Sequence, residues 1–143
     1  PTRRSSDLCV ADTDAWIEAR HGPIPDIFRA QGEAFFRQIE REAVREAALQ
    51  RGAVIATGGG AVIAPENRTL LRANAFVVQL ERPLRELATG GRPLSGNLET
   101  LERLYQARQP LYQAARDAVV TLRESPAETA RQVVRQFYEE VRA

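Results

Sequence analysis

The sequence predicts an α/β domain with a parallel sheet, and three features of the chain support that fold class. Short apolar segments rich in β-branched residues alternate with longer segments in which apolar residues recur at helical spacing. The short segment at residues 53–57 (Ala-Val-Ile-Ala-Thr) runs straight into Gly58-Gly59-Gly60, as a buried parallel strand does when it enters a tight turn. Prolines and glycines stand at the starts and ends of the helical segments, where they are favoured. Because ligands of open α/β sheets bind just outside the carboxyl ends of the strands, the glycine turn also predicts where a site lies.

The first half of the chain contains the longest predicted helix, at residues 33–50, because its apolar residues fall on one helical face. Gly52 follows as a candidate for the end of that helix. The elements expected in this half are, in order, a strand at residues 8–11, a short helix at 15–20, a helical turn at 24–28, the long helix, and the strand at 53–57.

The second half continues the alternation of helices and strands. Pro65 suits the first position of a helix, and residues 125–128 (Ser-Pro-Ala-Glu) form a capping box at the start of the last helix. The elements expected here are a helix at residues 65–74, a strand at 75–80, a short helix at 83–89, a helix at 98–115 interrupted near Pro110, a strand at 119–122 and the last helix.

Composition excludes several classes of function. A formal net charge of +1 gives no reason to expect nucleic acid or a membrane surface as a partner, and no apolar run reaches the ~20 residues of a membrane helix. The single cysteine, Cys9, excludes an internal disulfide and is consistent with a reducing compartment, so we expect a cytoplasmic protein. The chain contains no lysine, so the phosphate loop G-x-x-x-x-G-K-[ST] cannot occur in these 143 residues.

Two carboxylates, Asp12 and Asp14, follow the first predicted strand. If both belong to the strand, they face the same side, where they could hold Mg²⁺ through water and accept a proton from a substrate hydroxyl. The alternative is that one of them caps the helix that begins near Ala15. The spacing of the pair leaves both interpretations open.

Arg37 is a candidate for binding an anion within the longest helix. It lies next to the apolar face, and Glu40, one turn further on, could orient its guanidinium. The alternative is a surface ion pair with Glu33, which would contribute only a few tenths of a kcal/mol to stability.

Two further arginines stand in segments that favour ligand binding. Arg92 lies in a polar, glycine-rich stretch and could swing over the phosphates of a nucleotide. Arg108 comes just before the helix-breaking Pro110, and its planar guanidinium could bind a carboxylate through two hydrogen bonds. The alternative for both is an arginine surrounded by solvent.

In their order along the chain these motifs resemble the shikimate kinases, a family of P-loop kinases, from Asp12 to the end of the chain. The motifs are Asp-x-Asp at residues 12–14, Gly-Glu-x-x-Phe-Arg-x-x-Glu at 32–40, Ala-Thr-Gly-Gly-Gly at 56–60, Gly-Gly-Arg-Pro-Leu at 90–94 and Arg-x-Pro-Leu-Tyr at 108–112. The resemblance implies a three-layer parallel sheet of the nucleoside-monophosphate-kinase-like type. It also implies transfer of the ATP γ-phosphate to the 3-hydroxyl of shikimate, in the chorismate pathway of aromatic amino-acid biosynthesis.

The resemblance assigns roles on the side of the acceptor, shikimate. Asp14 is implied to hold hydroxyls of shikimate and to act as the base. Arg37 and Arg108 are implied to clamp its carboxylate, and the middle glycine of the turn to donate its backbone N–H. The acceptor-binding residues implied are Asp14, Arg37, Gly58, Gly59, Gly60 and Arg108.

The resemblance also assigns roles on the nucleotide side. Asp12 is implied to lie near Mg²⁺ and its waters, with ATP as co-substrate. Arg92 is implied to reach ATP from a lid and to assist the transfer, and Arg123 is the candidate beside the adenine. The partners implied are shikimate and ATP, and we expect a monomer.

Some elements of the family have no counterpart in these 143 residues. The first strand, the phosphate loop and most of the next helix would precede Leu8. We therefore expect residues 8–143 to form a kinase domain without its first, central strand, and residues 1–7 to be a non-native or disordered leader. We expect this chain alone to be inactive, and the intact parent enzyme to carry the loop. The alternative is a non-catalytic, ligand-binding module of a transcriptional regulator.

Overall fold

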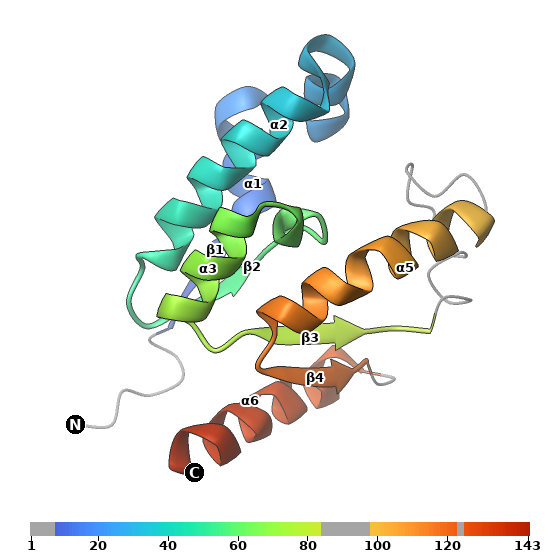
Figure 1. Ribbon diagram of the computed structural model, residues 1–143. Coiled ribbons are helices and arrows are strands. Elements are labelled where there is room, and N and C mark those ends of the chain that lie inside the picture. Colours follow the sequence, from blue (N-terminus) through green and yellow to red (C-terminus); the bar gives the residue numbers. More distant parts are fainter. Residues whose placement is uncertain (1–7, 84–97, 123–124) are drawn as a thin grey trace. The chain divides into compact units, whose positions relative to one another are not determined.

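The computed structural model describes residues 8–83, 98–122 and 125–143, and the chain divides into two compact units, Pro1–Ala75 and Phe76–Ala143 (Figure 1). Among the described residues, each unit contains one pair of parallel strands together with helices. The α/β class expected from the sequence is therefore confirmed. The leader expected at residues 1–7 and residues 84–89 of the expected short helix lie outside the described residues.

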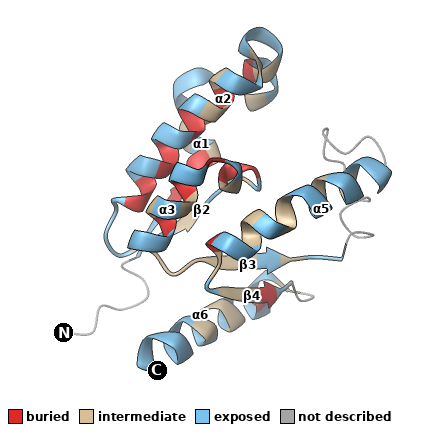
Figure 2. Ribbon diagram, viewed as in Figure 1, coloured by how far each residue is buried: buried red, intermediate tan, exposed pale blue. Residues whose placement is uncertain are grey.

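In the first unit, strand β1 (Cys9–Asp12) lies parallel to β2 (Ala53–Ala56), with Cys9 opposite Ala53 and Asp12 opposite Ala56. Helix α1 packs against helix α2 around an apolar cluster, and Figure 2 marks buried residues on both of them and on α3. The remaining elements of this unit are α1 (Thr13–His21), α2 (Ile24–Ala48), the short 3₁₀ helix η2 (Ala61–Ile63) and α3 (Pro65–Asn74). The buried cluster consists of Ile17, Ile27, Phe36, Ile39 and Ala43.

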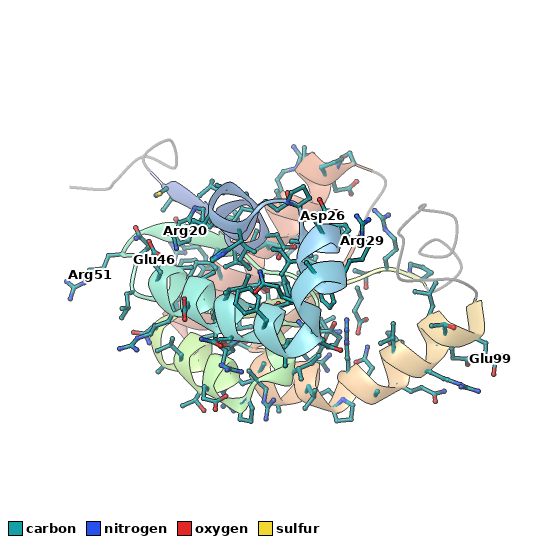
Figure 3. All side chains as sticks on the ribbon, turned by 90° about the horizontal axis from the view of Figure 1, so that it is seen from above. Arg20, Asp26, Arg29, Glu46, Arg51 and Glu99 are labelled. Carbon is teal, nitrogen blue, oxygen red and sulfur yellow. The ribbon has the colours of Figure 1, made fainter. Side chains whose placement is uncertain are left out.

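Glycines with positive φ shape the helices of the first unit. Gly22 follows α1 at φ 85°, a conformation that favours glycine and ends the helix. Gly32 stands inside α2 at φ 82° and ψ 174°, so the short helical turn and the long helix expected from the sequence form one element with a kink. On the outside, Arg20 of α1 and Glu46 of α2 form an ion pair with Nη1 and Oε2 2.7 Å apart (Figure 3).

In the second unit, β3 (Val78–Glu81) lies parallel to β4 (Ala118–Thr121). The predicted cap of the last helix, α6 (Pro126–Arg142), is confirmed, because the Glu128 N–H donates to the Ser125 hydroxyl oxygen at 3.2 Å. The expected interruption of α5 (Leu98–Ala115) is wrong, since this helix continues through Pro110. A proline removes one N–H donor, and the other turns of this 18-residue helix retain theirs.

The described strands of each unit pair only within that unit. Among the described residues, β2 pairs only with β1 and β3 pairs only with β4, so the strands form two separate two-stranded sheets. The loss of a central strand expected from the resemblance stays a prediction. Within the described residues no helix is long and apolar enough to cross a bilayer.

Candidate active site

The glycine turn that follows β2 lies between the carboxylate of Asp14 and the guanidinium of Arg37. A Cβ atom placed on Gly58 would lie 3.1 Å from Oδ1 and 3.3 Å from Oδ2 of Asp14. A Cβ atom placed on Gly60 would lie 2.5 Å from Nη1 and 2.7 Å from Nη2 of Arg37. Three segments far apart in sequence, at the start of α1, in α2 and after β2, thus converge on one turn. Four of the six predicted acceptor-binding residues, Asp14, Arg37, Gly58 and Gly60, are in close contact here, and Gly59 stands exposed between the two glycines.

The start of α1 corrects the interpretation of the aspartate pair. Strand β1 ends at Asp12, and Asp14 lies in the first turn of α1, so the two carboxylates do not share one face of a strand. Asp12 is the N-cap, and its Oδ1 accepts a hydrogen bond of 3.1 Å from the Ala15 N–H. The capping alternative is therefore confirmed for Asp12. Asp14 is half-buried at the positive end of the helix, where a carboxylate is stabilised.

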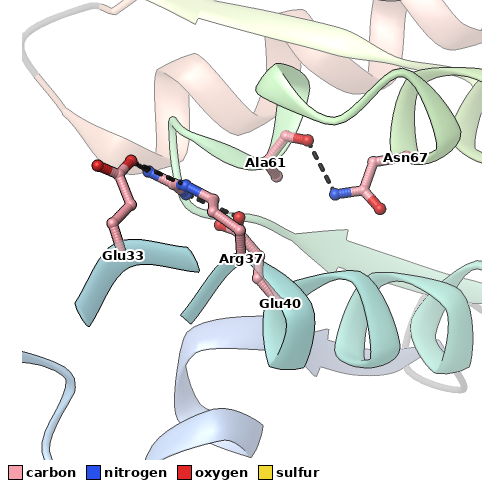
Figure 4. Close-up of polar contacts among 5 residues, drawn as sticks. All are labelled: Glu33, Arg37, Glu40, Ala61 and Asn67. Carbon is pink, nitrogen blue, oxygen red and sulfur yellow. Dashed lines mark hydrogen bonds and ion pairs between the residues drawn. The ribbon is translucent and has the colours of Figure 1, made fainter. Parts of the chain in front are cut away.

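The Arg37 guanidinium is held by two carboxylates of its own helix (Figure 4). Its Nη1 donates to Oε2 of Glu40 at 2.7 Å, and the side chain of Glu40 is only 2% exposed. Its Nε and Nη2 each donate to Oε1 of Glu33 at 3.2 Å, but the side chain of Glu33 is 63% exposed. Arg37 thus pairs with both carboxylates named from the sequence, and the pair with buried Glu40 is the shorter one, while anion binding by Arg37 stays a prediction.

Burial and charge act against each other on the pKa of Arg37. Burial has the largest single effect and lowers this pKa, while the hydrogen bonds and negative charges of Glu40 and Glu33 together outweigh it, so the pKa is raised. The guanidinium therefore stays charged at any physiological pH. A permanently charged, planar group fixed beside a glycine turn is suited to binding a carboxylate through two hydrogen bonds.

Sequence reasoning missed two buried polar residues next to the turn. Thr13 is completely buried, and its hydroxyl donates to the carbonyl of Ala56 at 3.3 Å. Asn67 is 2% exposed, and its Nδ2 donates to the carbonyl of Ala61 at 2.9 Å (Figure 4). The available signal was the spacing of Asn67 and the buried Leu71, which puts a polar residue on the core face of α3.

Three other predicted site residues belong to the second unit or lie outside the described residues. Arg108 lies half-buried on α5, in the second unit, so its joint action with Arg37 on one carboxylate stays a prediction. Arg92 and Arg123 lie outside the described residues.

Asp12 is the predicted ligand of Mg²⁺. The described residues contain no group of three or more His, Cys, Asp or Glu side chains that could hold a metal ion. Mg²⁺ in phosphate-transfer sites is usually held by one or two carboxylates together with waters and substrate phosphates. The exposed Asp12 carboxylate, with Oδ1 bonded to the helix, fits a contact through water better than an enclosing cage.

A shallow groove of about 260 Å³ between α2 and α3 is separate from this site. It combines two arginines with two glutamates, so it offers no net charge that would favour one class of ligand. Its lining residues are Gln38, Arg41, Glu42, Arg45, Glu66, Asn67 and Leu70.

Comparison with known sequences points to one family. A family model described as shikimate kinase matches residues 4–141. A shikimate kinase of Thiobacillus denitrificans is 44% identical over 126 residues, which cover 81% of this chain and 69% of that protein. One of Burkholderia lata is 40% identical over 126 residues, covering 82% of this chain and 68% of that protein. The chain spans 61% of the length of a third, from Bordetella avium, at 40% identity and 82% coverage of this chain.

Solved structures agree with the sequence comparisons. The shikimate kinase of Acinetobacter baumannii in complex with shikimate is similar with a TM-score of 0.82 and 29% identity, covering 93% of this chain and 79% of that one. The shikimate kinase of Aquifex aeolicus has a TM-score of 0.83 at 26% identity, covering 96% of this chain and 86% of that one.

Proposed function

This chain belongs to the shikimate kinase family, and from that premise we propose that it binds shikimate for phosphorylation of the 3-hydroxyl by ATP, in aromatic amino-acid biosynthesis. The observation that carries the proposal is the glycine turn with the Asp14 carboxylate on one side and the Arg37 guanidinium on the other. A ring acid with several hydroxyls presents both a carboxylate for the arginine and a hydroxyl for the aspartate. No contact among the described residues favours a non-catalytic regulatory module over this function.

Arg37 binds the carboxylate of shikimate in this proposal. Its guanidinium is fixed by Glu40 before the substrate arrives, so little side-chain entropy is lost on binding. Arg108 is the second cation of the clamp. The exposed Gly59 supplies a backbone N–H to the substrate, where the absence of a side chain allows close approach.

In the intact parent enzyme, Asp14 acts as the base toward the 3-hydroxyl. As the transfer proceeds, a bond forms between the hydroxyl oxygen and the γ-phosphorus, and the bond from that phosphorus to the bridging oxygen of ATP breaks. The hydroxyl proton goes to the Asp14 carboxylate, and ADP leaves with the electron pair of the broken bond.

The nucleotide side rests on residues that are proposed from the sequence. Asp12 would hold Mg²⁺ through water, and the bound ion would neutralise charge on the phosphates of ATP. Arg92 would reach the phosphates and Arg123 the adenine. These 143 residues contain no lysine and hence no glycine–lysine phosphate loop, so we expect the chain by itself to bind shikimate without phosphorylating it. We further propose that it works in the cytoplasm as a monomer.

Calorimetric titration with shikimate and with its methyl ester tests the acceptor site. The wild-type chain should prefer shikimate, because the ester has no charged carboxylate for Arg37. Arg37→Ala should weaken shikimate binding roughly tenfold or more and leave binding of the ester little changed, since a charge-assisted hydrogen bond contributes about 1.5–3 kcal/mol.

Arg41→Ala is the matched control, because Arg41 lies one turn further along α2 and lines the separate groove. The proposal is wrong if Arg41→Ala loses as much affinity for shikimate as Arg37→Ala. It is equally wrong if the wild-type chain, folded by circular dichroism, binds acid and ester alike.

A further inference from the structure

Asn67 is a buried polar side chain that the proposed chemistry does not use. It is 2% exposed in the first turn of α3, where an apolar residue of the same size would fill the space without an amide to satisfy. A buried amide is unfavourable unless it is hydrogen-bonded. Here Nδ2 donates to the carbonyl of Ala61, 2.9 Å away, and Ala61 is the residue directly after the glycine turn (Figure 4).

Arg68, the residue after Asn67, also forms hydrogen bonds with η2. Nη1 of Arg68 donates to the carbonyl of Val62 at 2.7 Å and to that of Ile63 at 3.1 Å. Three consecutive carbonyls of η2, those of Ala61, Val62 and Ile63, therefore accept hydrogen bonds from two consecutive side chains of α3. The attachment fixes η2 as a unit to the helix.

The glycine turn is closed onto η2 through the backbone. The Ala61 N–H donates to the carbonyl of Gly58 at 3.1 Å, and the Ile63 N–H donates to that of Gly60 at 3.0 Å. The carbonyl of Ala61 thus accepts a hydrogen bond from the Asn67 amide, while the N–H of Ala61 donates across the turn to the carbonyl of Gly58. Any displacement of Ala61 moves Gly60, whose backbone lies directly against the Arg37 guanidinium.

We propose that Asn67 is a positioning residue for shikimate binding: through Ala61 it sets the place of the glycine turn between Asp14 and Arg37. The inference rests on the proposed function, because it assigns a consequence to the position of that turn. Asn67 itself is proposed to touch neither the substrate nor the reacting atoms. Its effect is on the affinity for the acceptor and reaches the site through the backbone.

The test compares Asn67→Leu with Asn74→Leu in the full chain. Leucine has a similar branched shape and cannot donate. Asn74 is the matched control, because it lies on the same helix and its Nδ2 also donates to a backbone carbonyl, that of Leu70 at 2.9 Å, but in an exposed position. The measurements are thermal melting, shikimate affinity by calorimetry, and the backbone amide NMR signals of Gly58–Gly60.

We expect Asn67→Leu to weaken shikimate binding about fivefold to tenfold, the effect of losing one hydrogen bond, and to shift the amide signals of the glycine turn before any ligand is added. Asn74→Leu should leave both unchanged. If Asn67→Leu does not fold, Asn67→Ala, which adds no bulk, is measured in its place with the same expectation.

Two results separate this inference from the proposed function. Unchanged affinity and unchanged turn signals in a folded Asn67 variant would overturn the role of Asn67 and leave shikimate binding standing. A folded wild-type chain that binds no shikimate would overturn the proposed function, and the role of Asn67 in shikimate binding with it.

Discussion

Gly60→Ala tests the contact between the glycine turn and Arg37 most sharply. Gly60 has φ −85° and ψ −7°, which any L-residue adopts, so an alanine introduces no backbone strain. Its Cβ, however, would lie 2.5, 2.7 and 2.9 Å from Nη1, Nη2 and Cζ of Arg37. The guanidinium must retreat by about 0.9 Å to bring the shortest contact from 2.5 to 3.4 Å, the lower end of ordinary van der Waals separation.

A retreat of that size is enough to misalign the 2.7 Å hydrogen bond to Glu40, since N–H···O bonds fall within about 2.7–3.2 Å. It also moves the guanidinium away from the position in which it would meet the substrate carboxylate. Loss of one charge-assisted hydrogen bond of about 1.5–3 kcal/mol corresponds to roughly tenfold to a hundredfold weaker shikimate binding.

The assay is calorimetric or NMR titration with shikimate in a double-mutant cycle. Gly60→Ala should weaken binding in the wild-type background and have little further effect when Arg37 is already alanine. Gly22→Ala is the control for stability, because φ 85° strains an alanine by about 1–2 kcal/mol with no neighbour within 4 Å. An equal loss of affinity from Gly60→Ala in both backgrounds would refute the steric reasoning, as would no loss in either.

Three further outcomes follow from single contacts. Glu40→Gln should lower the free energy of unfolding by about 1.5–3 kcal/mol in a denaturant titration, whereas Glu33→Gln, at an exposed carboxylate, should change it by less than about 0.5 kcal/mol; similar losses in both would contradict the dominance of the buried pair. Asp12→Ala should lower the free energy of unfolding, measured by thermal melting, by about 1 kcal/mol, and Asp12→Asn should lower it by much less, since asparagine also caps helices. Equal losses in both variants would show that the charge of Asp12, and not its capping hydrogen bond, stabilises the helix. The pKa of Glu46 is lowered chiefly by its hydrogen bond to Arg20, so this carboxylate stabilises the fold above its unfolded-state pKa and the stabilisation is lost as the pH falls. In a pH series, the melting temperature of Glu46→Gln should therefore fall less steeply on the acid side than that of the wild-type chain. An equally steep fall in both proteins would contradict a stabilising role of the Arg20–Glu46 pair.

The sequence predicted the parts of the site that depend on residue type and order. The glycine turn, Arg37 and its partner Glu40 were all expected, because an apolar strand before three glycines and a charged pair at helical spacing are local patterns. The kink of α2 at Gly32 matched the expected gap between the helical turn and the long helix.

What the sequence did not predict depends on where the backbone changes direction or on tertiary contacts. The sequence left two interpretations of the aspartate pair open, and the shared strand face is the wrong one, because Asp12 caps a helix and Asp14 lies within it. A carboxylate that ends a strand and one that begins a helix have the same sequence signature, and only backbone dihedrals distinguish them. Asn67 was missed because its importance depends on the hydrogen bond from its buried amide to the carbonyl of Ala61. No local sequence pattern shows that these two groups meet.

Shikimate is proposed to bind at the turn between Asp14 and Arg37. An NMR titration of the isotope-labelled chain with shikimate locates the binding site residue by residue. We predict that the largest shifts fall on the backbone amides of Gly58–Gly60 and on the Arg37 side-chain Nε–H, and that they disappear in Arg37→Ala. Shifts concentrated on residues of the α2–α3 groove, or no shifts in a folded chain, would contradict the claim.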